Sequence, residues 1–262
     1  MRNLVLGLAA ALVLGACAGG AIPGIMLSQA APPVDAASQH IVAAVADARR
    51  PEADVARDAL RHPAEIMAFA GVRPGQVVAD VGPGGGYYTR LLAAALGAEG
   101  RVYGVIRPPQ PNATQRAPIY AIAESGQYTN MRVTEQDLQN WAMPEPLDTI
   151  FISQIYHDFH LPRFNYDIAA INRSLFNALK PGGTLMIIDH AAIAGSDASV
   201  ADTLHRIDQA LVVREVTAAG FVLEEESQVL RNPEDSRAER VFEADIRGRT
   251  DQFVLRFRKP AN

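Results

Sequence analysis

An apolar run that ends in an acid and then in glycines constrains the fold of this chain more than any other feature. Residues 77–81 read Val-Val-Ala-Asp-Val, and Gly-Pro-Gly-Gly-Gly-Tyr follows at residues 82–87. Such a run is typical of a buried strand, and the residues after it favour a helix. Glycines in the turn let the backbone approach a bound molecule, and the helix N-terminus offers it free N–H groups. The sequence therefore predicts a nucleotide-like cofactor at the carboxyl end of a first parallel strand.

Strand and helix patterns alternate along the chain. We predict strands at residues 76–81, 101–106, 131–133, 149–153, 184–188, 221–225 and 253–257. One helix is expected over residues 204–219, and a long charged connection over residues 231–251. No helical pattern separates the last two strands, so they should pair antiparallel. The pattern predicts an α/β fold with a doubly wound, mostly parallel, Rossmann-like sheet of seven strands and an antiparallel C-terminal strand.

The glycine-rich turn discriminates between two kinds of cofactor. A dinucleotide turn follows the pattern Gly-x-Gly-x-x-Gly, whose third glycine would fall at the bulky Tyr87. The pattern present is acid-x-Gly-x-Gly-x-Gly, filled by Asp80, Gly82, Gly84 and Gly86. It resembles motif I of the class I S-adenosylmethionine (SAM)-dependent methyltransferases. A nicotinamide-dependent oxidoreductase is correspondingly disfavoured.

Later motifs make the resemblance narrower. They are Tyr156-His157-Asp158, Asp189-His190, Leu204-His205-Arg206 and Thr250-Asp251-Gln252-Phe253. With the glycine-rich turn, they resemble a family of predicted exported bacterial SAM-dependent methyltransferases over roughly residues 54–260. The resemblance implies methyl transfer from SAM to an unidentified small-molecule acceptor.

The resemblance also implies the cofactor-binding residues. They are Asp80, Gly82, Pro83, Gly84, Gly86, Tyr87, Asp137 and Gln154. Asp137 matches the acid that usually contacts the adenine amine, and Gln154 lies where the fourth strand ends beside the methyl sulfonium. The structural alternatives are that Asp137 caps a turn and that Gln154 binds backbone at a strand end.

One position departs from the methyltransferase pattern. The second strand ends Val105-Ile106-Arg107, without the acid that usually accepts the ribose hydroxyls. Either another group holds the ribose, or SAM binding is weakened or lost. The alternative function is therefore a catalytically inactive methyltransferase-fold binding module of the cell envelope.

Polar residues follow the fourth and fifth predicted strands. His157, Asp158 and His190 should meet at the carboxyl ends of these strands, where α/β sheets bind ligands. A histidine there can remove a proton from the acceptor, since its ordinary pKa lies near neutrality, and we predict His157 as the general base. The alternative is that these residues hold loop backbone. His157 and His160 would face one ion in a helical turn, but Leu161-Pro162 ends the segment, and we predict no metal site.

The first residues have the form of an export signal. Residues 4–14 are apolar after Arg2, and Leu14-Gly15-Ala16-Cys17 resembles the lipobox of bacterial lipoproteins. The run is shorter than the ~20 residues of a spanning helix, so a cleaved signal fits better. We predict a signal peptide with lipobox over residues 1–17, a flexible tether over 18–39 and a methyltransferase-like domain with N-terminal helices over 40–262. A cytoplasmic protein with an apolar N-terminal helix is the alternative.

Charge and cysteine content limit the partners. The chain has 24 basic and 29 acidic residues and a net charge of −5, with no basic stripe, which argues against nucleic acid as the main partner. Cys17 is the only cysteine, so no internal disulfide can form. Lipid attachment to Cys17 would join the chain to a membrane.

Overall fold

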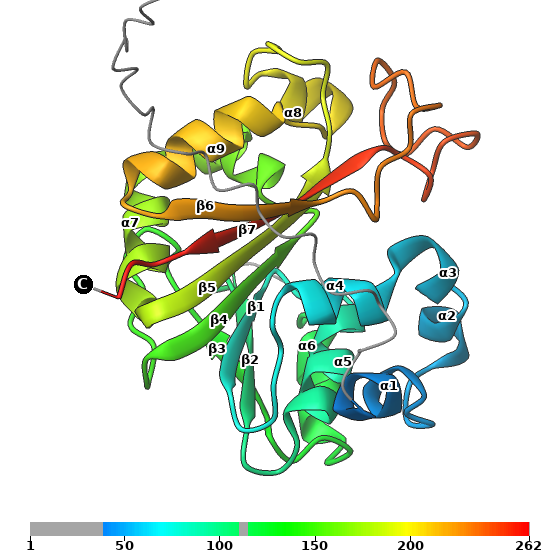
Figure 1. Cartoon of the computed structure of the whole chain (residues 1–262), viewed down its shortest axis with the longest axis vertical. Helices are drawn as coiled ribbons and strands as arrows, with labels where there is room; N and C mark the ends of the chain where they lie inside the picture. The colour runs from blue at the N-terminus through cyan, green and yellow to red at the C-terminus, as the bar shows by residue number, and fades with distance from the viewer. Residues whose placement is uncertain (1–38, 110–114, 262) are drawn as a thin grey trace, which may run out of the picture. The chain divides into compact units, whose positions relative to one another are not determined.

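One seven-stranded sheet organises the part of the chain that the computed structural model describes, residues 39–109 and 115–261 (Figure 1). Its strands are β1 (Val77–Val81), β2 (Arg101–Ile106), β3 (Met131–Glu135), β4 (Leu147–Ser153), β5 (Leu179–His190), β6 (Val222–Ser227) and β7 (Gln252–Arg258). They lie in the order β3-β2-β1-β4-β5-β7-β6. The first five pair in parallel, and β7 pairs antiparallel with β5 and β6. The predicted α/β sheet with an antiparallel C-terminal strand is confirmed.

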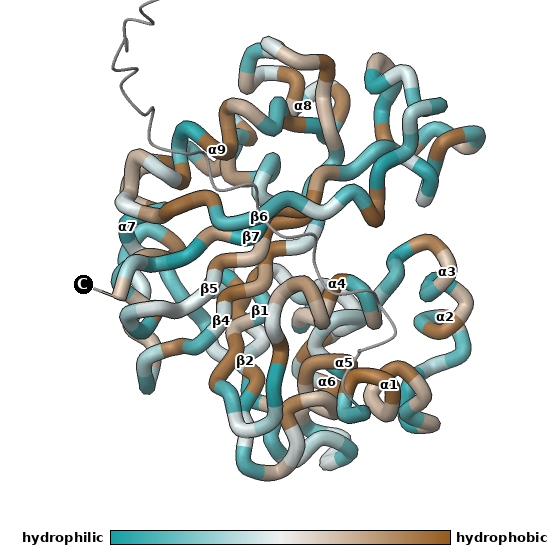
Figure 2. Tube along the Cα trace, in the orientation of Figure 1, coloured by the Kyte–Doolittle hydropathy of each residue, from teal (hydrophilic) through white to brown (hydrophobic). Residues whose placement is uncertain are grey.

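Helices cover both faces of this sheet (Figure 1). One face carries α1 (Gln39–Val45), α4 (Pro63–Phe69), α5 (Tyr87–Leu96) and α6 (Ile119–Glu124), with α2 (Glu52–Val55) and α3 (Asp58–Arg61) between α1 and α4 in the chain. The other face carries α7 (Ile168–Ala178) and α9 (Gln209–Ala218). Figure 2 shows the hydrophobic colouring along the central strands.

Burial on both faces explains the continuous apolar run in β1. Every residue of this strand is buried. Successive side chains point to opposite faces, so Val78 packs in the core beneath α5 and Ala79 in the core beneath α7. On β2, a Cβ at Gly104 would lie 2.9 Å from Cγ1 of Ile119, so the glycine lets α6 lie close to the sheet.

The prediction of a single helix over residues 204–219 is wrong. Helix α8 (Val200–Leu204) ends at His205, which has the left-handed φ of 53°, and α9 begins after Asp208. Between the two helices, Ile207 forms a parallel bridge with Ala191 just beyond β5. This pairing interrupts the helical pattern and places His205 in a turn beside the sheet.

Two other boundaries differ from the sequence prediction. Strand β5 begins at Leu179 because Leu147 pairs with Leu179 and Thr149 with Thr184, so residues 180–183 loop out between the two pairs. The sequence of residues 52–60 alone predicts one short helix, but the structure divides this segment into the shorter helices α2 and α3.

The predicted signal peptide, with Cys17 and all but the last residue of the predicted tether, lies outside the described residues. Helix α1 begins at Gln39, where the tether was expected to end. Within residues 39–109 and 115–261, no helix has the length and apolar character needed to cross a membrane.

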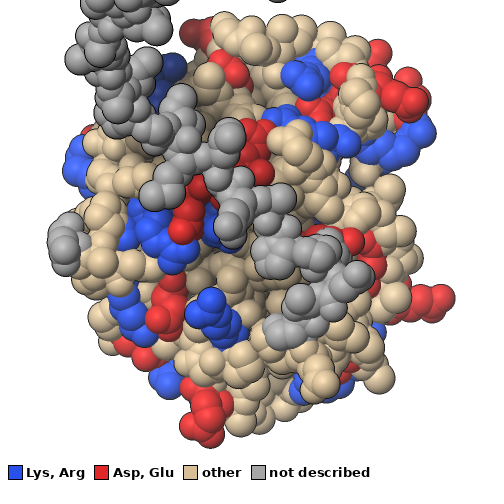
Figure 3. All heavy atoms as spheres, in the orientation of Figure 1, with Lys and Arg blue, Asp and Glu red and all other residues tan. Residues whose placement is uncertain are grey.

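Charged side chains of both signs are interspersed on the face of the molecule in Figure 3. Ion pairs cross between the last two strands of the sheet. Arg256 pairs with Glu225 and Arg258 pairs with Glu224, each at 2.6 Å. Here the acids compensate the basic side chains locally.

Candidate active site

A cavity of about 590 Å³ lies at the carboxyl ends of β1 and β2. This is the edge at which open parallel sheets bind ligands. Its lining includes Gly82, Pro83 and Gly84, residues 105–109 at and after the end of β2, residues 115–118 before α6, Glu135, and the three residues Ile155, Asp158 and Phe159 after β4. Of the eight residues predicted to bind the cofactor, Gly82, Pro83 and Gly84 therefore line this cavity.

The three glycines of the turn differ in the space around the position that a Cβ atom would occupy. Gly82, Gly84 and Gly86 all have positive φ values, of 63°, 52° and 81°. A Cβ at Gly84 would meet nothing within 4 Å, whereas one at Gly82 would lie 2.6 Å from Cδ1 of Ile155. A Cβ at Gly86 would lie 2.4 Å from Cδ1 of Ile122. Gly84 therefore faces open space, and the other two glycines accommodate neighbouring side chains.

Asp80 and Tyr87 lie behind the cavity wall and do not line it. Asp80 is fully buried in β1 and accepts a hydrogen bond of 2.5 Å from the hydroxyl of Thr89. Burial raises the pKa of Asp80 to about 7, against a smaller lowering by this hydrogen bond. The hydroxyl of Tyr87 donates to Asp58 at 2.7 Å, which joins α5 to the N-terminal helices.

Gln154 joins three segments of the chain and does not line the cavity. Its Oε1 accepts from Nη2 of Arg61 at 2.5 Å, and its Nε2 donates to Oε1 of Gln252 at 2.9 Å. Arg61 also lies 4.6 Å from the centre of the Tyr87 ring. The side chain of Gln154 therefore connects the end of β4 to α3 and β7.

Asp137 caps a turn at the surface. Its Oδ1 accepts a hydrogen bond of 3.0 Å from the backbone N–H of Gln139, and the carboxylate does not line the cavity. The acid that does line it is Glu135, the last residue of β3, which accepts a hydrogen bond from the hydroxyl of Tyr120. Because Ile106 pairs with Glu135, this carboxylate lies beside the end of β2. The sequence analysis missed Glu135, although it lies only two residues before Asp137.

Arg107 occupies the position after β2 where the acid is missing. Its guanidinium lies 4.0 Å from the centre of the Phe164 ring, and both residues line the cavity. A cationic group stacked on an aromatic ring is held in place there. Glu135, which pairs with Ile106 across the sheet, supplies a carboxylate beside this position.

His157 is held by Asp189, which the sequence placed in a motif but not among the predicted site residues. The backbone N–H of His157 donates to Oδ2 of Asp189 at 2.8 Å, and its Nδ1 lies 2.7 Å from Oδ1. Burial lowers the pKa of His157, but the charge and hydrogen bond of Asp189 raise it by more, so the pKa lies above its usual value. Because Nδ1 is engaged, Nε2 is the ring nitrogen of His157 that remains for other partners.

Two further groups meet Nε2 of His157. Oδ1 of Asp158 lies 3.4 Å from it, and Nδ1 of His205 lies 3.3 Å from it. His205 was absent from the predicted site because its position depends on the break between α8 and α9. Motif spacing gives no sign of that break.

His190 and His160 turn to other partners. Nδ1 of His190 lies 2.7 Å from the hydroxyl of Thr250, and burial lowers the pKa of this histidine to about 4. Its ring centre is 6.1 Å from that of His157. Nε2 of His160 instead lies 3.1 Å from Glu215 on α9. The structure thus brings His157, Asp158 and His190 near one another and directs His160 elsewhere.

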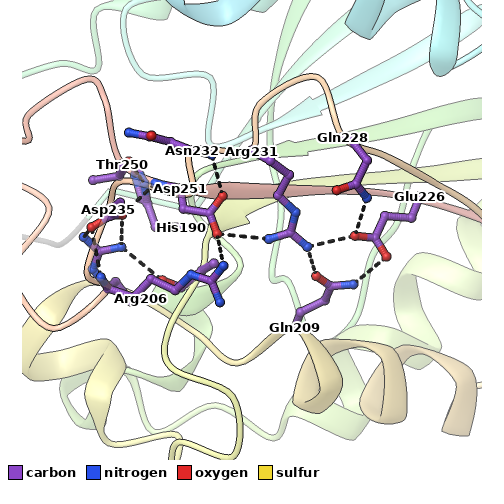
Figure 4. A network of polar contacts seen from close by, with 12 residues as sticks. His190, Arg206, Gln209, Glu226, Gln228, Arg231, Asn232, Asp235, Thr250 and Asp251 are labelled. Atoms are coloured by element: carbon purple, nitrogen blue, oxygen red, sulfur yellow. Dashed lines mark hydrogen bonds and ion pairs between the residues drawn. The ribbon is translucent and has the colours of Figure 1, made fainter.

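A polar network fixes the long connection between β6 and β7 next to His190 (Figure 4). Arg206 and Asp235 form a fully buried ion pair at 2.7 Å. Asp251 accepts from Arg231 at 3.2 Å and pairs with Arg237 at 2.9 Å. The acids of this connection therefore compensate some of its arginines.

The fold and the glycine-rich turn agree with a comparison to known protein families. Residues 73–231, more than half of the 262 residues, match the family model described as a methyltransferase domain. The chain belongs to this methyltransferase family. The prediction of a class I SAM-dependent methyltransferase is thereby confirmed at the level of the family, and SAM is the cofactor that this membership supports.

A curated relative matches part of the chain. Protein-L-isoaspartate O-methyltransferase 1 of Arabidopsis thaliana is 34% identical over 119 residues, which cover 44% of this chain and 46% of that protein. The chain thus spans about half the length of this relative.

Solved structures show the same fold. A SAM-dependent methyltransferase from Aquifex aeolicus matches with a TM-score of 0.55 at 19% identity, covering 78% of this chain and 93% of its own. The 1,6-didemethyltoxoflavin-N1-methyltransferase of Burkholderia thailandensis, solved with S-adenosylhomocysteine bound, matches with a TM-score of 0.51 at 18% identity, covering 84% and 85%. At these identities the likeness concerns the fold alone.

Proposed function

We propose that the methyltransferase domain transfers the methyl group of SAM to a small-molecule acceptor, and that both molecules meet at the cavity beside the glycine-rich turn. The observation that carries this proposal is the bare face of Gly84, which opens onto a cavity of about 590 Å³ at the carboxyl ends of the parallel strands. Cofactor bound there would lie against main chain that carries no side chain.

The cofactor's ribose has a candidate partner in Glu135. This carboxylate lines the cavity one strand away from the usual position, and the register of β2 and β3 places it beside Ile106. Two carboxylate oxygens can accept both ribose hydroxyls. We assign Glu135 to this role, since Arg107 at the end of β2 offers only donors.

The acceptor would be bound at the other end of the cavity. Asp158 lines the cavity and lies next to Nε2 of His157. With Nδ1 fixed by Asp189, Nε2 is the atom that can take a proton from the acceptor in a metal-free site. The acceptor atom then forms a bond to the methyl carbon as the carbon–sulfur bond breaks, which leaves S-adenosylhomocysteine. Positioning of the acceptor supplies most of the rate because the sulfonium is already reactive.

Binding of S-adenosylhomocysteine to the purified full chain tests this proposal by isothermal titration calorimetry. We expect saturable binding, and we expect Gly84→Ala to weaken it by at least about tenfold because the added methyl group enters the cavity. Gly126→Ala is the matched control. Gly126 has a φ of 71° with open space at its Cβ and does not line the cavity, so its variant has similar backbone strain without the block.

The absence of binding at millimolar ligand would overturn the catalytic proposal. It would favour the inactive binding module, for which the supporting observations are the missing acid after β2 and the side chain of Ile155, which fills the space beside Gly82 that a Cβ would need. If binding is found, methyl transfer should be assayed with isoaspartyl peptides first, because the curated relative is named for isoaspartate O-methylation. Nitrogen heterocycles form the second panel.

We also propose that the chain is an exported lipoprotein related to the exported bacterial methyltransferases that it resembles. The support is the sequence alone: an apolar run at residues 4–14 followed by the lipobox-like residues that end at Cys17. Expression in a bacterial host should place the full chain in the membrane fraction, and Cys17→Ser should release it. Equal fractionation of the two forms would contradict lipidation.

A further inference from the structure

We propose that Nε2 of His157, Oδ1 of Asp158 and Nδ1 of His205 bind a divalent transition-metal ion such as Zn²⁺ beside the cavity. Two imidazole nitrogens and one carboxylate oxygen form a donor set that Zn²⁺ and Fe²⁺ accept in proteins. The three ligand atoms lie within 4.8 Å of one another. From the sequence we predicted no metal site, because the pair considered was His157 and His160, whose segment is ended by Leu161-Pro162, and the distant His205 was not considered.

The separations of the ligand atoms match the size of a coordination sphere. Nε2 of His157 lies 3.4 Å from Oδ1 of Asp158 and 3.3 Å from Nδ1 of His205, and the latter two atoms lie 3.9 Å apart. Bonds of about 2.0–2.2 Å at tetrahedral angles place neighbouring ligands roughly 3.4 Å apart. One ion therefore reaches all three atoms with little movement of the side chains.

The carboxylate behind His157 supports the same assignment. Asp189 is fully buried and lies 2.7 Å from Nδ1 of His157. Metal-bound histidines commonly donate their second ring N–H to a carboxylate, which fixes the tautomer and aims the other nitrogen at the ion. The backbone N–H groups of His157 and His190 also donate to Asp189, so this carboxylate is held on both oxygens.

The site is open on one side. The side chain of His157 is 5% exposed, but those of His205 and Asp158 are 17% and 36% exposed, and Asp158 lines the cavity. Three protein ligands with an open fourth position are the arrangement of catalytic rather than structural zinc sites.

The ion's role in methyl transfer rests on the proposed function, although its binding does not. An acceptor oxygen or nitrogen at the open position would have its pKa lowered and lose its proton to water. Its lone pair then attacks the methyl carbon as the carbon–sulfur bond breaks. With the metal bound, Nε2 of His157 is a ligand and cannot act as a base. The metal content of the purified protein therefore decides between the two roles of His157.

Isothermal titration of Zn²⁺ into the chelator-treated full chain tests the site. We expect one equivalent to bind, and His205→Gly and Asp158→Asn each to weaken binding by at least about tenfold. Glycine suits position 205 because φ is 53° there. His160→Gln is the matched control: it removes a histidine of the same turn whose Nε2 lies by Glu215, so Zn²⁺ affinity should stay unchanged. Co²⁺ spectra of the same variants report the geometry.

Failure to bind one equivalent of Zn²⁺ would overturn the proposal. The proposal would also be overturned if His205→Gly and Asp158→Asn bound Zn²⁺ as tightly as the parent chain does. If His205→Gly does not fold, Asp158→Asn alone decides. A loss in His160→Gln equal to that in the ligand variants would also overturn it. Binding of S-adenosylhomocysteine is measured on the same samples. If the cofactor product binds and Zn²⁺ does not, the proposed function stands without the metal site. If Zn²⁺ binds and S-adenosylhomocysteine does not, only the metal site stands.

Discussion

Asp80 and Asp189 are both fully buried at the same edge of the sheet, but their surroundings move the pKa in opposite directions. Burial raises the pKa of Asp80 to about 7, and the hydrogen bond from the hydroxyl of Thr89 lowers it by a smaller amount. Burial acts the same way on Asp189, but the charge of His157 and its hydrogen bonds outweigh it and lower the pKa. The chain itself therefore provides a charged partner for Asp189, beside the histidines (the histidine side). It provides only a weak one for Asp80, beside the glycine-rich turn (the glycine side).

This difference separates a preorganised region from one that awaits a ligand. The histidine side is fixed by the buried pair of Arg206 and Asp235 (Figure 4) and by the hydrogen bonds of Asp189. On the glycine side, Gly84 faces an open cavity, and Arg61 is the charged residue that lowers the pKa of Asp80. SAM carries an ammonium and a sulfonium, and cations of this kind stabilise a nearby carboxylate that has no charged hydrogen-bond partner in the protein. Substitutions should thus affect stability on one side and cofactor binding on the other.

The largest expected effect concerns the stability of the histidine side. Asp235→Asn removes the charge that compensates the fully buried Arg206, so the free energy of unfolding should fall by about 3–5 kcal/mol. Denaturant titration measures this loss. Glu234→Gln is the matched control, since Glu234 is the exposed neighbour of Asp235. A loss below about 1 kcal/mol would contradict the view that this ion pair fixes the region.

A smaller effect is expected on cofactor affinity at the glycine side. Glu135→Gln should weaken S-adenosylhomocysteine binding by roughly tenfold to a hundredfold, because charge-assisted hydrogen bonds to the ribose are lost. Stability should change little, since Glu135 is exposed at the end of β3.

Asp137→Asn is the discriminating control for this substitution. The sequence assigned Asp137 to adenine, whereas the structure shows its carboxylate capping a turn outside the cavity lining. If Asp137→Asn weakens the binding and Glu135→Gln does not, the sequence assignment is right and our assignment of the ribose to Glu135 is wrong.

The glycine side was the more predictable of the two because its pattern is local. The apolar run of β1 and the turn after it lie within 11 successive residues, 77–87. The apolar pattern also predicted the strands that form the sheet. Even there, Glu135 was missed because only the register between Ile106 and Glu135 shows which acid lies beside the end of β2.

The histidine side depends on contacts between distant segments. His157 and His190 could be placed at one edge because β4 and β5 are parallel neighbours, and parallel strands end together. His205 could not, because the bridge between Ala191 and Ile207 breaks the helix that local periodicity favours. A helical pattern on both flanks gives no signal for that long-range pairing.

The smallest expected effect is a pH dependence of stability that isolates Asp80. Its pKa is about 7 in the folded chain and about 3.9 in an unfolded one. Between these values the folded protein keeps a proton that the unfolded chain has released, so stability falls as pH rises from about 4 to about 7. The contribution of one such group is at most about 1.4 kcal/mol per pH unit.

Asp80→Asn should therefore remove this part of the slope. Denaturant titrations of the ligand-free chain at pH 5 and pH 6 measure it, with the exposed Glu99→Gln as control. If Asp80→Asn and the parent chain lose stability equally over that interval, Asp80 is ionised at pH 5 and has a charge partner. The glycine side would then be as preorganised as the histidine side. Saturating S-adenosylhomocysteine should flatten the parent slope, because its ammonium favours the ionised carboxylate.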